Sequence, residues 1–400
     1  MIIFVKISFF WVAFFCRILY YILRGEWMKK VLLALDSFKG SMDALSVCET
    51  IANELCDAYE TVIFPMADGG EGTVDAIVNA RDGKYVSVNT VDHLGREIVA
   101  SYGLCADTAV IEVSSICGLN LVVPSERDLM SSNSFGLGKL IDSAKDNGAK
   151  NFIFAIGGTG TNDGGYGLGR ALGFRFYDKN GDELPPTPDS LIRLARIKPP
   201  IFDIGMHNVT IACDVKNKLC GEHGASLVYG FQKGGTLEQL KLLDKGLFNF
   251  ARIIEKDLGV NVSDLEGSGA GGGISAGLVA FCGGKLKSGY SIVSEATEVE
   301  NVIKNVDVVV TGEGKTDSQT LFGKLPYGII KSAKKYNKIV ALVSGCITEE
   351  GKNGLNAIGC DAMFSCVDDK IFVDEAIKNA KTNLVRASKD LKNWLDELSV

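Results

Sequence analysis

Near the middle of the chain, an apolar stretch of strand length is followed by glycines, threonines and an acidic residue. Residues 152–156 are apolar, and the loop after them, 157–165, contains Asn162 and Asp163 among glycines and threonines. A loop of this kind places bare backbone N–H groups and a carboxylate at the end of a buried strand, where they can bind an anion and a metal ion. The pattern therefore predicts a ligand-binding loop.

The same pattern recurs at other apolar runs, which also end in glycine or small polar residues and mostly in a carboxylate. The loops after these runs are 36–41, 67–73, 157–165, 214–217, 311–317 and 344–345. Ligands of open α/β sheets lie outside the carboxyl ends of the strands. We therefore expect the loops to converge on one cleft.

The loops contain what a nucleotide-dependent phosphoryl transfer requires, namely cations or backbone donors, carboxylates for Mg²⁺, and a group that orients the acceptor hydroxyl. Lys39 and Lys315 are cations in glycine-flanked loops. The carboxylates are Asp68, Glu71, Asp163, Glu313 and Asp317. Structural roles are open as alternatives. Asp163 could cap a helix that begins at Gly164, Lys39 could be a solvated surface lysine, and Asp214 could close a turn.

Other catalytic motifs are incomplete. Gly314-Lys315-Thr316 resembles the end of a Walker A motif, but residue 309 is valine where that motif needs glycine. Residues 267–272 match GxGxxG without a clear preceding strand, so this glycine run could be a hinge, a close helix contact or a ligand cradle. The three histidines lie outside the glycine loops and GxSxG is absent, which argues against a serine hydrolase.

The composition is that of a globular enzyme with two domains. The 400 residues are 46% hydrophobic and 23% charged, and one core rarely serves more than about 300 residues. The net charge of −7, without a dense basic cluster, argues against nucleic-acid binding. Eleven cysteines without a CxxC pair indicate the reduced thiols of a cytoplasmic protein rather than a zinc site.

The first 27 residues differ from the residues after them. Residues 2–21 are apolar but are interrupted by Lys6 and Arg17, so they are a marginal membrane span, and no signal-peptide cleavage site precedes Trp27. The residues from Met28 onward are typical of the start of an α/β protein. We expect residues 1–27 to be an upstream extension outside the fold, with a membrane segment as the alternative that hydropathy does not exclude.

Strand–loop–helix units at both ends of the chain enclose a middle part with a different pattern. Near the N-terminus, Ser41 is placed to cap a helix. In the middle part, residues 86–88 and 98–102 alternate as antiparallel strands do, and Thr236 with Gln239 predicts a capped helix to residue 258. We expect an α/β protein in which residues 28–88 and 292–400 form a doubly wound parallel-sheet domain, interrupted by a mixed α/β domain at residues 89–291.

Seven blocks of residues stand in an order that is informative as a set. They are Asp36-Ser-Phe-Lys-Gly-Ser41, Ala67-Asp-Gly-Gly-Glu-Gly-Thr73, Thr161-Asn-Asp-Gly-Gly165, Ala212-Cys-Asp-Val-Lys-Asn217, Gln232-Lys-Gly234, Thr311-Gly-Glu-Gly314 with Asp317 and Gln319, and Gly323-Lys-Leu-Pro326. Together they resemble the bacterial glycerate kinases that form 2-phosphoglycerate. The resemblance implies phosphorylation of D-glycerate with ATP and Mg²⁺, and a flavodoxin-like domain interrupted by a second α/β domain. The choice of the 2-hydroxyl rests on the resemblance alone.

The resemblance and the loop chemistry together give a set of expected site residues. Expected to act in catalysis are Asp163, Lys39 and Lys315; to bind substrate or nucleotide, Ser37, Lys39, Gly69, Gly70, Gly157, Gly158, Thr161, Asn162, Asp214, Gly312 and Gly314; and to hold Mg²⁺, Asp68, Glu313 and Asp317. Lys39 or Lys315 would hold the glycerate carboxylate, and Asp163 would orient or deprotonate the attacking hydroxyl. Lys315 stands where the family has arginine, so it keeps the charge but loses two-pronged hydrogen bonding.

Two other functions remain as alternatives. The same loops could bind a sugar acid without chemistry, as in a sensor. The glycine run near Gly269 could serve a nicotinamide-dependent dehydrogenase of hydroxy acids. Release of ADP in the presence of glycerate separates the first from a kinase, and nicotinamide absorbance detects the second.

Overall fold

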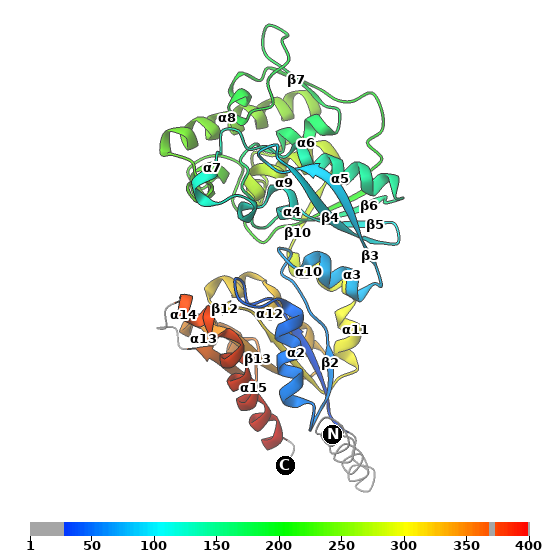
Figure 1. Cartoon of the computed structure of the whole chain (residues 1–400), viewed down its shortest axis with the longest axis vertical. Coiled ribbons are helices and arrows are strands. Elements are labelled where there is room, and N and C mark those ends of the chain that lie inside the picture. Colours follow the sequence, from blue (N-terminus) through cyan, green and yellow to red (C-terminus); the bar gives the residue numbers. More distant parts are fainter. Residues whose placement is uncertain (1–27, 368–372, 399–400) are drawn as a thin grey trace, which may run out of the picture. The chain divides into compact units, whose positions relative to one another are not determined.

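The computed structural model describes residues 28–367 and 373–398, and the expected extension at residues 1–27 lies outside them. The chain forms two compact units, and Figure 1 colours them along the sequence, so the cyan and green segments belong to the second unit and the orange and red segments to the first. The first unit ends at Met66 and resumes at Glu298, and the second unit is Ala67–Thr297. The chain is an α/β protein with a parallel sheet in the first unit and a mixed sheet in the second.

The strands of the first unit form a parallel sheet. They are β1 (Lys30–Leu35), β2 (Glu60–Ile63), β11 (Val308–Gly312), β12 (Lys315–Thr316), β13 (Ile339–Ile347) and β14 (Ala362–Val367). The order across the sheet is β2-β1-β11-β13-β14, with the short β12 pairing β13 beyond the end of β11. The direction of winding reverses between β1 and β11. In open α/β sheets, the ligand site lies at the carboxyl ends of the strands beside such a reversal.

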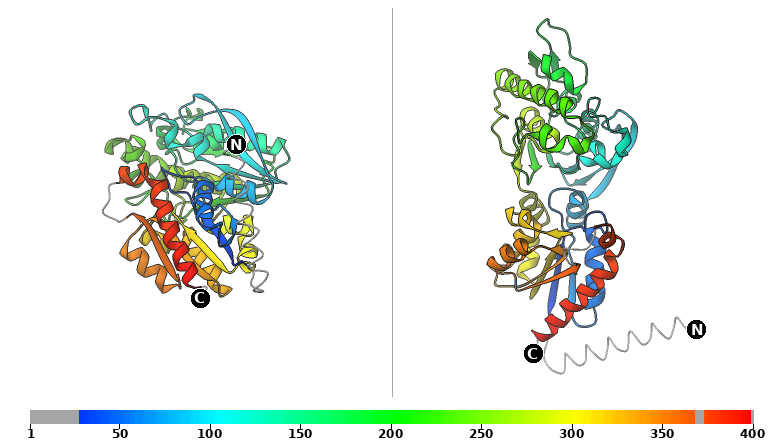
Figure 2. Two further views of the ribbon diagram at one scale, coloured as in Figure 1. Left: turned by 60° about the horizontal axis from the view of Figure 1, so that its bottom comes forward. Right: turned by 90° about the vertical axis from the view of Figure 1, so that its left-hand side faces the viewer.

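Helices cover both faces of this sheet. They are α2 (Ala44–Leu55), α11 (Val299–Lys304), α12 (Leu325–Lys335), α13 (Glu349–Ala357), α14 (Val373–Lys378) and α15 (Ala380–Glu397). Leu33 of β1 shares an apolar core with α2 and α15, and α15 is the red helix that crosses the strands in Figure 2, left. Leu32 is equally buried and points to the opposite face, because side chains alternate along a strand. That face is covered by α12, which contacts β11 and β13.

The second unit contains a mixed sheet in the order β10-β9-β6-β5-β4-β3. Its strands are β3 (Lys84–Val91), β4 (Glu97–Cys105), β5 (Thr108–Glu112), β6 (Asn151–Ala155), β9 (Asn208–Ala212) and β10 (Lys285–Lys287). β3 and β4 pair antiparallel, which confirms the expectation from the alternating segments. β6, the apolar run before the glycine loop, pairs parallel to β5 and β9 in the middle of the sheet.

Helices also flank the mixed sheet. They are α3 (Thr73–Ala80), α4 (Ser114–Cys117), α5 (Phe135–Asp146), α6 (Tyr166–Ala171), α7 (Ala225–Tyr229), α8 (Leu237–Leu258), α9 (Ile274–Cys282) and α10 (Gly289–Thr297). The boundaries expected after residue 88 and before residue 292 lie inside this unit. The difference arises because Val74 and Ile77 of α3 and Ala296 of α10 pack in one cluster with Val110 of β5.

The structure confirms one of the expected helix caps and corrects another. The capping box of Thr236 and Gln239 at α8 is confirmed. The expected cap Ser41 is wrong, because α2 begins two residues later with Asp43, whose carboxylate accepts a hydrogen bond from the N–H of Ser46. Ser134 precedes α5 as its N-cap residue, but its hydroxyl makes no capping hydrogen bond.

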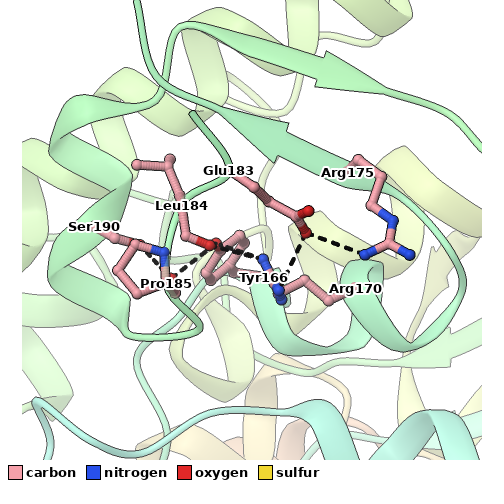
Figure 3. A network of polar contacts seen from close by, with 7 residues as sticks. All are labelled: Tyr166, Arg170, Arg175, Glu183, Leu184, Pro185 and Ser190. Atoms are coloured by element: carbon pink, nitrogen blue, oxygen red, sulfur yellow. Dashed lines mark hydrogen bonds and ion pairs between the residues drawn. The ribbon is translucent and has the colours of Figure 1, made fainter. Parts of the chain in front are cut away.

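A polar network fixes α6, the helix that follows the glycine loop (Figure 3). The hydroxyl of the fully buried Tyr166 donates to the carbonyl of Pro185 at 3.0 Å, and Arg170 donates to the carbonyl of Leu184 at 2.9 Å. Glu183 forms ion pairs with Arg170 and Arg175 at 3.3 and 3.1 Å. Arg175 lies in β7 (Arg175–Tyr177), which pairs with β8 (Arg196–Lys198), so the network ties α6 to this small sheet.

Candidate active site

The first unit contains a cavity at the carboxyl ends of its strands. Its volume is about 460 Å³, within the range of about 300–1,000 Å³ that is usual for small-molecule sites. Its lining comes from the loops after β1 and β11, from β13 and β14, and from α14 and α15. The cavity therefore lies where the strand order predicts a ligand site.

Charged side chains of both signs line this cavity. The lysines are Lys39, Lys315 and Lys324, and the carboxylates are Asp36, Glu313 and Asp317. Ser37 and Gly314 also line it. The expected residues of the loops at 36–41 and 311–317 therefore meet at one site. Asp36 and Lys324 were not expected there. Asp36 directly follows β1, as the other acidic residues at strand ends follow their strands, and Lys324 stands in the block Gly323-Lys-Leu-Pro326 of the family resemblance.

Hydroxyl groups hold Glu313 in place. Its side chain is nearly buried, and its Oε1 accepts a hydrogen bond from the hydroxyl of Thr320 at 2.5 Å. The hydroxyl of Thr316 lies 3.3 Å from the same oxygen, and the hydroxyl of Ser344 donates to the Glu313 carbonyl at 2.9 Å. A carboxylate held in this way keeps a fixed orientation at the cavity wall, which a ligand site requires.

Asp36 and Asp317 are also oriented by nearby groups. Asp36 accepts a hydrogen bond from the N–H of Ser37 at 2.7 Å. Asp317 caps the short helix Ser318–Phe322 by accepting from the N–H of Gln319 at 2.9 Å. The ammonium of Lys315 lies 3.5 Å from the other Asp317 oxygen. The cavity therefore presents acidic and basic groups side by side.

The donor set of the cavity is compatible with Mg²⁺. Magnesium prefers oxygen ligands and is usually held by one or two carboxylates together with water and phosphate oxygens. The three carboxylates of the cavity could supply such ligands. Within residues 28–367 and 373–398, no group of three or more metal-binding side chains is gathered, so the site would need ligands from a nucleotide. Asp68, an expected ligand, belongs to the second unit.

Gly312 is required by the sheet rather than by a ligand. A Cβ atom at Gly312 would lie 1.7 Å from the carbonyl oxygen of Val343 in the neighbouring strand β13. Gly345 has a similar role, because its Cβ would lie 2.3 Å from the Gly314 carbonyl. These contacts let the strand ends approach closely enough to form the cavity floor. Gly312 itself is absent from the cavity lining.

The expected loops of the second unit also meet one another. A Cβ on Gly69 would lie 2.5 Å from the Cα of Gly289 and 2.9 Å from the Cβ of Ala212 at the end of β9. A Cβ on Gly157 would lie 3.3 Å from the Cα of Gly70. Asp214 accepts a hydrogen bond from the N–H of Gly289 at 2.8 Å. The expected residues Asp68, Gly69, Gly70, Gly157, Gly158 and Asp214 therefore form a rim at the carboxyl ends of β6 and β9.

Asp163 lies in the interior below this rim. It is fully buried, as are Thr161 and Asn162. Its carboxylate accepts four hydrogen bonds, from the N–H and hydroxyl of Ser134, from the N–H of Gly165 and from the N–H of Gly167. These protein donors satisfy the carboxylate, and they correspond to the helix-capping alternative rather than to a group that faces substrate.

The glycine run at 267–273 packs directly on the loop that contains Asp163. A Cβ at Gly272 would lie 1.9 Å from the Thr161 carbonyl oxygen, and one at Gly273 would lie 2.7 Å from the Cα of Gly164. Both glycines have positive φ angles, of +68° and +89°. Of the three alternatives, the contacts favour close packing, because the space beside these glycines is filled by backbone.

The sequence analysis did not identify Lys233, which supports the same loop from inside. Its side chain is buried, and its ammonium donates to the Thr161 carbonyl at 2.7 Å and to the Thr159 hydroxyl at 3.3 Å. Burial lowers the pKa of Lys233 to about 8, and the negative charge of Asp163 opposes this shift. The only sequence feature that pointed to Lys233 was its position in the block Gln232-Lys-Gly234 of the family resemblance. Burial also lowers the pKa of the neighbouring His93.

A family model described as the glycerate kinase family matches residues 31–396. The chain belongs to the glycerate kinase family. The glycerate kinase of Bacillus subtilis (strain 168) is 39% identical over 369 residues, which cover 90% of this chain and 96% of that relative. The glycerate 2-kinase of Escherichia coli (strain K12) is 40% identical over 369 residues, covering 90% and 97%. The resemblance seen in the seven blocks is thereby confirmed.

A solved structure supports the glycerate kinase fold as well. A crystal structure assigned as glycerate kinase 2 from Salmonella typhimurium LT2 aligns with a TM-score of 0.78 and 39% identity, over 93% of this chain and 99% of that chain. Among the helices at residues 28–367 and 373–398, none is long and apolar enough to cross a membrane. The ten cysteines in this part of the chain are free thiols.

Proposed function

We propose that this chain phosphorylates D-glycerate with ATP and Mg²⁺ and releases 2-phosphoglycerate, in the cytoplasm. One observation carries the proposal. A chain of the glycerate kinase family has a cavity at the carboxyl ends of its parallel strands that is lined by lysines and carboxylates together. Lysines match the charge of phosphates, and carboxylates match the metal that accompanies them.

The cavity residues have distinct proposed roles. Lys39, Lys315 and Lys324 would contact the phosphates, because ammonium groups neutralise phosphoryl oxygens without needing a fixed planar geometry. Glu313, with Asp36 or Asp317, would hold Mg²⁺. When bound, this ion would neutralise charge on the transferring phosphoryl group. The hydroxyls around Glu313 would keep its carboxylate oriented for that purpose.

The rim of the second unit is proposed to contribute backbone donors. Gly157 and Gly158 are exposed, and Gly158 has a φ of +67°, a left-handed conformation of the kind found in backbone anion-binding loops. Such an arrangement suits a carboxylate or another anion. Asp163 is proposed to position this loop rather than to accept a proton, and its four hydrogen bonds within the protein support that revision.

The decisive experiment is product analysis. Wild-type protein would be incubated with ATP, Mg²⁺ and D-glycerate, with ADP release followed by a coupled assay and the product identified by phosphorus NMR. We expect ADP release that depends on both glycerate and Mg²⁺, and the resonance of 2-phosphoglycerate. The 3-phosphate would correct the position of transfer. Glycerate binding without ADP release would instead support the sensor alternative.

The dehydrogenase alternative has less structural support. The GxGxxG segment follows no strand, since the residues before it lead from the long helix α8. The space beside its glycines is filled by protein backbone. A Cβ atom added at Gly269 would collide with the Lys218 carbonyl, and one added at Gly272 would collide with the Thr161 carbonyl. A dinucleotide fold uses these glycines to bring backbone close to pyrophosphate. Absence of a nicotinamide absorbance change with glycerate would complete this argument.

A further inference from the structure

The two ends of the first unit's cavity differ in chemistry. The charged residues come from the loops after β1 and β11 and from the residue before α12. Apolar side chains come from the end of β14, which is an edge strand of the sheet, and from α14 and α15. They are Val367, Ala376, Ile377 and Ala380. These apolar residues are defined here as the apolar end of the cavity.

The apolar end is only partly covered by protein. Ile377 is 38% exposed, and the other three side chains are half-buried. Four neighbouring apolar side chains that line a cavity, rather than a single exposed one, indicate a surface that a ligand can cover. Glycerate has three carbons, each bearing oxygen, so it offers no apolar surface to this end. The nucleotide offers an aromatic base.

One amide group lies at this end without a protein partner. Asn383 of α15 lines the cavity, and its side chain has no hydrogen-bond partner among residues 28–367 and 373–398. A primary amide carries an acceptor oxygen and two N–H donors. An asparagine amide can pair with adenine by accepting from the exocyclic amine and donating to a ring nitrogen.

The surrounding charges indicate which end of the cavity suits phosphates. A second groove adjoins the cavity and shares Ser41, Ile377 and Ala380 with it. That groove is lined by the carboxylates of Asp43, Glu49 and Glu54 as well as by two lysines. Acidic groups there disfavour phosphates beside Ile377. The phosphates belong at the end with Lys39, Lys315 and Lys324, which leaves the apolar end for the base.

We propose that the apolar end of the cavity binds the adenine base of the nucleotide, and that Asn383 reads the edge of that base. This inference rests on the proposed kinase function. The base packs against Val367 and Ile377, and the amide of Asn383 favours adenine over guanine. Asn383 is thus a specificity-determining residue.

Two variants and a matched control test this assignment in the full-length protein. Ile377→Asp places a charge where the base would pack, and Asn383→Ala removes the amide. Leu45→Asp is the control, because Leu45 is 44% exposed on α2 in the same unit and lines neither the cavity nor the groove. Steady-state kinetics would be measured with ATP and with GTP, at varied nucleotide and at varied glycerate.

The expected results separate this inference from the proposed function. Ile377→Asp should raise the KM for ATP about tenfold and leave the KM for glycerate within about twofold, because it removes apolar contacts with the base and places a charge at the nucleotide cavity. Asn383→Ala should lower the ratio of kcat/KM for ATP to that for GTP about tenfold. Leu45→Asp should behave as wild type. An unchanged KM for ATP in the first variant, or an unchanged ratio in the second, would overturn the inference while wild-type turnover of glycerate kept the function intact.

Discussion

At the scale of single residues, Asp163 illustrates a carboxylate that is used within the protein. Asp163→Asn would place an amide NH₂ group either against the N–H of Gly165, which now donates to Oδ1, or against the N–H groups of Ser134 and Gly167, which now donate to Oδ2. Because buried donors would lose their acceptor, we expect a loss of about 2–4 kcal/mol in unfolding free energy. Urea unfolding would measure it. Turnover would also fall, and the cause would be displacement of the loop that contains Asp163 rather than loss of a proton acceptor.

Asp128→Asn provides a matched control for this prediction. Asp128 is exposed and accepts hydrogen bonds from the N–H of Met130 and the hydroxyl of Ser131. Water can replace these bonds, so the cost should stay below about 1 kcal/mol. Equal costs for the two variants would contradict the structural role of Asp163. A stable Asp163→Asn variant without turnover would restore the proton-transfer role.

Glu313 is the carboxylate on which the proposed metal site depends. Glu313→Gln keeps an oxygen that can accept from the hydroxyl of Thr320, but it removes the negative charge. We therefore expect the fold to remain intact while the Mg²⁺ concentration for half-maximal rate rises at least about tenfold. Initial rates over a Mg²⁺ titration would show it. Wild-type Mg²⁺ dependence in this variant would remove Glu313 from the site.

Lys233 should give the protein a measurable pH dependence of stability. Its pKa is lowered from 10.5 to about 8 in the folded protein, so between these values the unfolded chain binds more protons. Stability from this group therefore rises as pH increases through that window, and it is constant below about pH 8. From pH 7.5 to 9.5, wild type should gain about 2 kcal/mol relative to Lys233→Met.

The Lys233 prediction is tested as a difference between two proteins. Buried cysteines with a raised pKa, such as Cys48 at about 12, lower stability at alkaline pH in both proteins and cancel. Asp163, His93 and Cys117 surround the ammonium, and all three are present in both. Urea unfolding at the two pH values supplies the measurement. Parallel stability curves for the two proteins would show that Lys233 does not titrate in this range.

Residue types and spacing predicted that the charged loops of the first unit would meet, and in the structure they line one cavity. Lys39, Glu313, Lys315 and Asp317 line one cavity because each follows a parallel strand, and such strands end at the same edge of a sheet. The sequence could not separate Asp163 from these residues, since it also follows a strand. Only the three-dimensional packing shows that Ser134, 29 residues away, fills the space around its carboxylate.

At the scale of elements, the contact between the glycine run and the loop after β6 gives a direct test. Gly272→Ala would bring a Cβ to 1.9 Å from the Thr161 carbonyl, at a φ of +68°. Gly283→Ala is the matched control, because Gly283 has a φ of +64° and nothing within 4 Å of the added atom. Backbone strain should cost about 1–2 kcal/mol in both variants.

The difference between these two variants isolates the packing contribution. Overpacking should add about 1–3 kcal/mol at Gly272 alone, and the shifted loop should also lower turnover. Unfolding midpoints of the two variants would measure the effect. Equal stability losses would mean that the run does not hold the loop, and would return the ligand cradle to consideration.

Helices were predictable from the sequence where more than one local feature marked their ends. The long helix α8 had a capping box at its start and Gly259 at its end, and both are observed. The start of α2 was predicted wrongly at Ser41, because serine and aspartate are both residue types that cap helices and the structure uses Asp43. Near the C-terminal end, α14 and α15 are divided at Asn379, a break that the helical spacing of Ile377, Ala380 and Leu384 does not reveal.

At the scale of the whole molecule, the division into two units follows from packing rather than from local pattern. In the sequence, α3 and α10 both have the pattern of helices in strand–helix repeats. We therefore predicted that α3 belongs to the first unit. Their apolar faces instead pack together beneath β4 and β5. The unit boundaries at Met66 and Glu298 therefore depend on contacts between segments more than 200 residues apart, which local pattern does not show.

This division makes a prediction about where a nucleotide acts. Every described residue that lines the cavity proposed for ATP belongs to the first unit. Hydrogen exchange with ATP and Mg²⁺ should therefore slow in peptides that cover 36–41 and 311–317, since bound ligand shields these loops. Peptides over Gly157 and Gly158 should exchange at the rate of the free protein until glycerate is added. Glycerate alone serves as the control. Protection by ATP at residues 157–160 without protection at 36–41 would place the nucleotide on the second unit, and the roles given to Lys39, Glu313 and Asn383 would have to be abandoned together.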